Sequence, residues 1–334
     1  MIKKFLLHHP VHKHIVPNFD IIFIINPTLF FSVWIMVVVG MICANINMHD
    51  QALWITEFSW EICFVFLGLT LLFGASFILI QIADEKKEQE NYQLSLIGQH
   101  ISVDKSQSIV NILLMIGGLI TFISNWMVVL PALCIYFLWG IVYNQKSIVS
   151  KRKIIFSCMI NSFIGALLFT IGWILGIDDN SQNENILFNA NLFSYMLPYL
   201  LCYSAVAAMV ILKNMESKII SNFNESTFFN KYTYFILIVL LMVCTALYLS
   251  LDNEDPLAST AILVSLPFFI FVVFRRLGKD LLRAIRYPIF IFNFFALPYY
   301  PWLSLPLFCT YYISKYYYWH RFDLHYPTFL VDND

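Results

Sequence analysis

The sequence predicts an all-α integral membrane protein with about nine transmembrane helices and a polar cap that faces the cytoplasm. Three observations lead to this fold class. Of the 334 residues, 60% are hydrophobic and only 12% are charged, and the mean hydropathy is +0.72. The apolar runs are long enough to cross a hydrocarbon layer of about 30 Å, and they lack the alternation of a membrane β-barrel. Most of the Lys and Arg residues lie in the N-terminal arm and in alternate loops.

The apolar runs predict the elements in order. A basic, His-rich arm at residues 1–19 precedes one transmembrane helical domain at 20–317, and an aromatic and polar tail covers 318–334. No small-residue cleavage site follows the first run, so we expect it to remain as a helix. The ninth span lies between 285 and 317, where Pro298, Pro301 and Pro306 predict either a kinked span or a re-entrant pair. The first eight spans are predicted at 21–46, 60–83, 108–123, 127–143, 154–176, 191–212, 232–251 and 258–274.

Charge placement orients these helices in an inner, cytoplasmic-type membrane. The N-terminal arm and the loops after spans two, four, six and eight hold 18 of the 20 Lys and Arg residues. Because positive loops stay in the cytoplasm, the N-terminus is predicted to be cytoplasmic. Nine full spans would place the C-terminal tail outside, whereas a re-entrant ninth element would return it to the cytoplasm. The four histidines of the arm leave metal binding open as an alternative to a basic juxtamembrane segment.

The seven cysteines all lie in apolar runs and form no CxxC pair. This placement predicts small, buried packing residues and argues against disulfides or zinc ligands. The basic residues form no continuous stripe, so nucleic acid is not an expected partner.

An acidic stretch directly follows the second span. On a helix, Gln81, Asp84 and Glu88 share one face because they are spaced i, i+3 and i+7. Two carboxylates at the membrane surface could hold a divalent cation through oxygen ligands. The alternative is a solvated helix end that anchors the span at the interface.

A second polar region follows span eight and carries five basic residues. Such a cluster suits anionic lipid headgroups or a diphosphate, and it could equally serve only to set the topology. These residues are Arg275, Arg276, Lys279, Arg283 and Arg286.

The layout resembles the UbiA superfamily of intramembrane prenyltransferases, which have nine helices and two aspartate-rich cytoplasmic motifs. Gln81, Asp84 and Glu88 match the first motif, N-x-x-D-x-x-x-D, with two conservative replacements. The small residues at 74–76 and the segment Gly98 to Ser102 are similar to stretches that flank that motif.

The resemblance implies a fold and a chemistry. In the family, carboxylates from both motifs hold Mg²⁺ ions that bind and activate an isoprenoid diphosphate. It implies catalytic roles for Asp84 and Glu88, with Glu216 as a further metal ligand. The implied substrate-binding residues are Gln81, Tyr143, Arg152, Lys153, Asn161 and Asn214.

The second motif departs from the family pattern. The loop after span six contains no aspartate, and Glu216 stands between Lys213 and Lys218. Isoprenoid or isoprenoid-diphosphate binding without magnesium-dependent transfer is therefore the leading hypothesis. The alternatives are an active divergent prenyltransferase, a non-catalytic membrane subunit with a membrane-protein partner, and a transporter or channel of unrelated fold.

Overall fold

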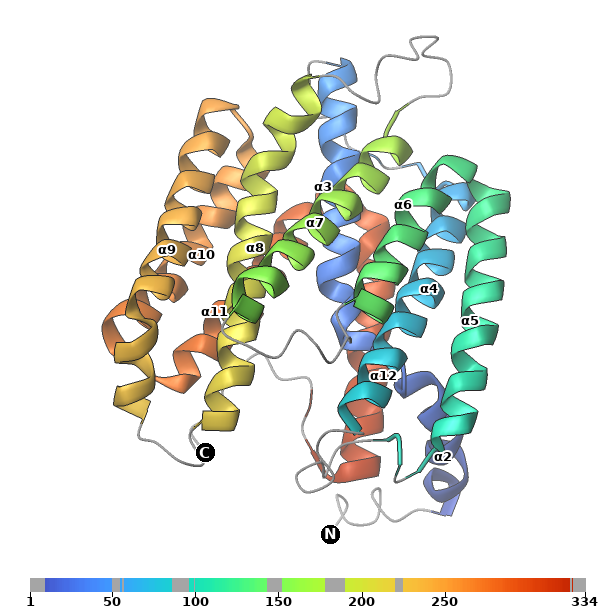
Figure 1. The fold of residues 1–334 in the computed structure, drawn as a ribbon. Helices are drawn as coiled ribbons and strands as arrows, with labels where there is room; N and C mark the ends of the chain where they lie inside the picture. The colour runs from blue at the N-terminus through green and yellow to red at the C-terminus, as the bar shows by residue number, and fades with distance from the viewer. Residues whose placement is uncertain are drawn as a thin grey trace. The chain divides into compact units, whose positions relative to one another are not determined.

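The computed structural model describes residues 10–49, 55, 57–85, 96–98, 100–142, 152–177, 190–219, 225–324 and 326. Within these ranges the regular structure is helical, and one isolated bridge joins Ile97 to Ile101 (Figure 1). The prediction of an all-α protein is confirmed for this part of the chain.

The helices follow the predicted runs closely over most of the chain. The second predicted span, for example, begins at Trp60, where α4 also begins. The elements are α2 (Pro10–Phe23), η1 (Pro27–Leu29), α3 (Phe30–His49), α4 (Trp60–Glu85), α5 (Val103–Ser124), α6 (Trp126–Tyr136), η2 (Phe137–Val142), α7 (Arg152–Leu175), α8 (Ala190–Ile219), α9 (Glu225–Asp252), α10 (Pro256–Arg275), α11 (Gly278–Ala296), η5 (Pro301–Leu303) and α12 (Ser304–Phe322).

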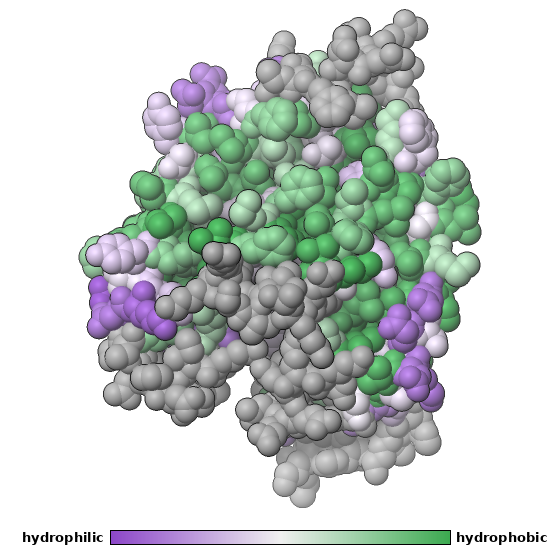
Figure 2. Space-filling model, in the orientation of Figure 1, coloured by the Kyte–Doolittle hydropathy of each residue, from purple (hydrophilic) through white to green (hydrophobic). Residues whose placement is uncertain are grey.

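Seven of the described helices are long and apolar enough to cross a membrane: α3, α4, α5, α7, α8, α9 and α10. A shorter apolar helix covers Trp126–Val142. On the face drawn in Figure 2, apolar side chains cover the middle of the described helices and hydrophilic ones gather toward helix ends. By the length and composition of its helices, the chain is a multi-pass membrane protein.

The chain divides into two compact units. Unit 1 comprises residues 1–30, 58–146 and 302–328. Here α4 packs along α5 and α6, and α12 packs on α2 and η1. Small residues allow the close crossing of α4 and α5, because a Cβ atom at Gly117 would lie 2.9 Å from the carbonyl oxygen of Gly68.

Unit 2 comprises residues 31–57, 147–301 and 329–334. Within it α8 packs against α7, α9 and α11, while α10 packs against α9 and α11. Helices α3 and α7 touch backbone to backbone at Gly40, Gly172 and Gly176, where an added Cβ would overlap the facing helix. Such contacts are typical of membrane bundles, in which small residues let helices approach.

The structure corrects the first predicted span. Helix α2 ends at Phe23, and Asn26 adopts a left-handed conformation with φ of 50° before Pro27. The helix that enters the membrane therefore begins after this break and not at Ile21. Asparagine tolerates positive φ better than most residues, and proline cannot continue the preceding helix, so these two residues account for the break.

The ninth predicted span is two helices. Helix α11 begins at Gly278, directly after α10, and helix α12 follows a turn at Leu297–Tyr300 and the short η5. The alternative of a single kinked span is wrong, because a turn separates the two helices. The prolines near the end of α11 explain the turn, because proline lacks the N–H that would continue the helical ladder.

The cysteine prediction is partly wrong. All seven thiols are free, as expected, and Cys43 and Cys202 are buried. Cys63, Cys134, Cys244 and Cys309 are exposed on the described surface of their helices. Their apolar neighbours do not distinguish a helix face toward lipid from one toward protein, because both are hydrophobic in a membrane.

Candidate functional site

The first acidic motif lies at the C-terminal end of α4. Asp84 occupies the last turn of that helix, as its spacing with Gln81 predicts. The side chain of Asp84 lies outside the described residues, as do Glu88 and Tyr143. Their roles as metal ligands, catalytic groups or substrate contacts stay predictions.

Gln81 is engaged inside unit 1. Its Nε2 donates to the carbonyl oxygen of Ile24 at 2.6 Å and lies 3.5 Å from that of Phe77. Ile24 lies between the end of α2 and the break at Asn26. The amide therefore ties the end of α4 to the α2–η1 turn, and the contact of Gln81 with substrate stays a prediction.

The segment from Leu96 to Ser102 has a local structure that explains its residue types. Gly98 has φ of 85°, a conformation that favours glycine. The N–H of Gly98 donates to the carbonyl oxygen of Ile101, which is buried in the core of unit 1. Ser102 then caps α5 by accepting the N–H of Lys105. The residues that carry the family resemblance here thus form a turn and a helix cap.

The two basic residues predicted to contact substrate, Arg152 and Lys153, open α7, and their side chains lie outside the described set. Asn161 lies two turns further along α7 and donates to the carbonyl oxygen of Ser157 at 2.8 Å. Asn214 is exposed near the end of α8.

Glu216 lies on a helix, not in the loop that the sequence predicts, because α8 continues to Ile219. Its side chain is fully buried, and Oε2 accepts from Nζ of Lys213 at 2.5 Å. The other oxygen, Oε1, packs against Gly278, the first residue of α11, and has no hydrogen-bond partner among the described atoms. Leu277 gives α11 no side-chain cap, so the carboxylate of Glu216 supplies negative charge at that helix N-terminus.

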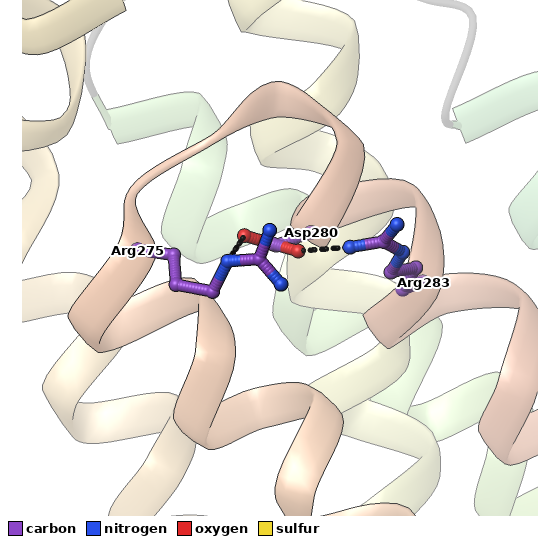
Figure 3. Close-up of polar contacts among 3 residues, drawn as sticks. All are labelled: Arg275, Asp280 and Arg283. Carbon is purple, nitrogen blue, oxygen red and sulfur yellow. Dashed lines mark hydrogen bonds and ion pairs between the residues drawn. The ribbon is translucent and has the colours of Figure 1, made fainter. Parts of the chain in front are cut away.

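A second buried carboxylate, Asp280, lies in the first turn of α11. Asp280 is fully buried between two arginines (Figure 3). Nη1 of Arg283 lies 2.8 Å from Oδ1, and Nε of Arg275 lies 3.6 Å from Oδ2. The side chain of Arg275 keeps 49% of its surface exposed and that of Arg283 keeps 23%, so a ligand can reach both.

These contacts join the ends of α8, α10 and α11 into one charged region, which we term the basic cluster. It contains six cations and two carboxylates, so its formal charge is +4. Arg276 is also held, since its Nη1 donates to Oδ1 of Asn230 at 2.7 Å. Most of the predicted loop is helical, because only Arg276 and Leu277 separate α10 from α11. The members are Lys213, Glu216, Arg275, Arg276, Lys279, Asp280, Arg283 and Arg286.

Asp280 was not predicted as a site residue, because the five basic residues dominate the charge of this stretch. A single acid inside a run of five cations is a usable signal, since charge-bearing groups that become buried need a partner. The described residues contain no group of three or more His, Cys, Asp and Glu side chains that could hold a metal ion. Asp84 belongs to unit 1 and Glu216 to unit 2.

A buried ion pair in unit 1 was also missed. Asp20 accepts the O–H of Tyr317 at 2.5 Å and Nη2 of Arg321 at 2.8 Å. The ring of Phe23 stacks on Tyr317 beside it. This pairing fixes the end of α12 to α2 across almost the whole chain length, which local sequence patterns do not reveal.

Comparisons of the chain with protein-family models, curated proteins and solved structures find no match. The UbiA resemblance therefore stays a prediction that rests on the residues quoted for it.

Proposed function

We propose that the protein binds the diphosphate headgroup of an isoprenoid lipid at the basic cluster of unit 2. The observation that carries this proposal is the pair of buried carboxylates, Glu216 and Asp280, which hold Lys213, Arg275 and Arg283 in place. Arginine presents a planar fork that matches phosphate oxygens, and lysine adds a compact positive charge.

The buried carboxylates favour a binding role over a purely topological one. Loop cations orient a membrane protein without being held in fixed positions. Fixing a long side chain on binding costs about 0.5–1.5 kcal/mol, and Asp280 reduces this cost for two arginines by holding them before the ligand arrives. The net charge of +4 leaves an excess of positive charge for an anionic headgroup.

The proposed topology has ten membrane crossings. Each helix from α3 to α12 crosses once, and α6 and η2 together form one of the crossings. Helices α11 and α12 each have 19 residues and are about 28 Å long, close to the hydrocarbon thickness. The ion pair between Asp20 and Arg321 supports an even number of crossings, because it joins the segment before α3 to the end of α12. In this topology every connection that carries Lys or Arg faces the cytoplasm, and Arg286 and Lys315 lie in the cytoplasmic halves of α11 and α12.

Prenyl transfer is the second candidate function, and Asp84 at the end of α4 is the residue that favours it. Glu216 supports binding more than transfer, because its two oxygens face Lys213 and Gly278. Magnesium-dependent release of diphosphate from farnesyl diphosphate, abolished by Asp84→Asn, would establish the enzymatic function. A stoichiometric membrane partner without such release would favour the non-catalytic subunit.

The direct test compares two ligands that have the same isoprenoid tail and differ in the charge of the headgroup. Purified protein in nanodiscs of zwitterionic lipid is titrated with farnesyl diphosphate and with farnesol. Binding of the diphosphate at least tenfold tighter, reduced by Arg283→Gln, supports the proposal. Equal affinity for both ligands, or affinity that Arg283→Gln leaves unchanged, contradicts it. Lys105→Gln removes an exposed cation in unit 1, outside the basic cluster, and serves as the control.

A further inference from the structure

The backbone of Arg276, at the end of α10, is in the left-handed conformation, with φ of 55° and ψ of 43°. Helices that end in this way usually have glycine at that position, because a Cβ atom makes positive φ unfavourable. Asparagine and aspartate tolerate positive φ, which accounts for Asn26 and Asp323, whereas arginine has no such tendency. The chain therefore keeps an arginine where glycine would be the more stable choice.

The side chain of Arg276 is held toward the start of α9. Its Nη1 donates to Oδ1 of Asn230 at 2.7 Å, and its Nε donates to the carbonyl oxygen of Val273 at 3.3 Å. Both acceptors are neutral, in contrast to the carboxylate of Asp280 between its two arginines (Figure 3). Arg276 and Asn230 are both exposed. These contacts use only part of the guanidinium fork, which has five N–H groups, so the rest can bind a ligand.

We propose that Arg276 binds the anionic headgroup directly and that Asn230 is its positioning residue. The inference rests on the proposed function of the basic cluster. A strained backbone conformation persists where the surrounding structure fixes it, and such positions are common in ligand-binding sites. Asn230 holds the guanidinium in one place before the ligand arrives, which lowers the entropy cost of binding.

A purely structural role for Arg276 predicts a different result. Arginine can close the end of a helix by donating to its last carbonyl groups, as Nε does to Val273. In that role, replacing Arg276 would lower the stability of the protein. As a headgroup contact, Arg276 is kept at the expense of backbone strain, so glycine at this position should raise stability and weaken binding. The sign of the change in stability separates the two roles.

The experiment measures the affinity of Arg276→Gly for farnesyl diphosphate and for farnesol in zwitterionic nanodiscs, together with its unfolding midpoint. Binding of the diphosphate should weaken at least fivefold, affinity for farnesol should stay the same, and the midpoint should rise. Glu254→Gly is the matched control, because Glu254 is exposed and has φ of 51° in the turn before α10. It should also raise the midpoint, and it should leave both affinities unchanged.

Asn230→Ala tests the positioning role. It should weaken diphosphate binding at least twofold in the wild-type protein and have no further effect in Arg276→Gly, because the amide acts through the guanidinium. An equal loss of affinity in the two backgrounds would contradict that role.

The outcomes separate this inference from the proposed function. A wild-type protein that binds farnesol as tightly as the diphosphate would overturn both. If the wild type prefers the diphosphate and Arg276→Gly keeps that preference, this inference alone fails. Weaker binding together with a lower unfolding midpoint would assign Arg276 a structural role and would also overturn it. If Arg276→Gly fails to fold, Arg276→Asn decides the outcome, since asparagine tolerates positive φ and carries no charge.

Discussion

The carboxylate of Glu216, on α8, packs directly on Gly278, the first residue of α11. Any side chain at position 278 would overlap Oε1 of the glutamate. A buried acid therefore fills the space that a Cβ would occupy, and its second oxygen pairs with Lys213. This contact connects the lysine of α8 to the two arginines that Asp280 holds on α10 and α11.

Gly278→Ala should destabilise the protein because the methyl group displaces a buried, ion-paired carboxylate. The expected loss in the free energy of unfolding is about 1–3 kcal/mol, typical of overpacking at a well-filled site. Denaturant titration in mixed micelles measures it. Gly118→Ala is the matched control, and it should be neutral or stabilising by up to about 1 kcal/mol because nothing lies within 4 Å of its Cβ.

A double-mutant cycle tests the origin of that loss. In a Glu216→Ala background the overlap is absent, so Gly278→Ala should then cost much less than in wild type. An equal loss of unfolding free energy in the two backgrounds would show that the added methyl group does not overlap the side chain of Glu216.

The contact between Asp20 and Arg321 predicts the side of the C-terminus. With α12 returning to α2, reporters fused to the two ends of the chain should label from the same side of the membrane. Accessibility of the two fusions to a membrane-impermeant reagent measures this. Labelling of the two ends from opposite sides would contradict ten crossings.

Asp255 predicts a pH dependence at the other end of unit 2. Its Oδ1 accepts the N–H groups of Leu257 and Ala258, and Oδ2 accepts the O–H of Tyr199. Burial raises the pKa of Asp255 above its usual value, although these hydrogen bonds lower it part of the way back. Because the folded pKa is the higher one, the protonated form contributes stability that is present below about pH 4 and is lost as the pH rises through the folded pKa.

Asp255→Asn keeps a helix-capping side chain without the titration. The difference in unfolding free energy, wild type minus variant, should therefore fall as the pH rises. A difference that is flat or grows with pH would show that hydrogen bonding outweighs burial at this carboxylate.

The apolar runs predicted most helices because a membrane span has a required length and composition. The predicted span at 60–83 and the helix Trp60–Glu85 agree within two residues, since Asp84 and Glu85 close the apolar run. The break at Asn26 could also have been predicted, because Asn-Pro is a common turn signal. It was overlooked inside a continuous apolar stretch.

The charged contacts could not be predicted in the same way. Glu216 and Gly278 are far apart in sequence, and only the packing of α8 on α11 brings them together. Glu216 was predicted as a site residue from its place in an expected motif, and Gly278 lies in a stretch that the sequence predicts to be a loop. Local patterns identify helices and charge runs, whereas partners of a buried charge depend on tertiary packing.

In the proposed function, buried carboxylates hold the cations of the basic cluster in position to bind a diphosphate. Asp280→Asn separates position from charge, because it raises the formal charge of the cluster from +4 to +5 while removing the ion-pair acceptor of Arg275 and Arg283. Affinity for farnesyl diphosphate in zwitterionic nanodiscs is the measurement, with the unfolding midpoint recorded to show that the variant is folded. Binding should weaken at least threefold despite the added positive charge, because the two arginines lose the acceptor that positions them. Unchanged or tighter binding would contradict the proposed function.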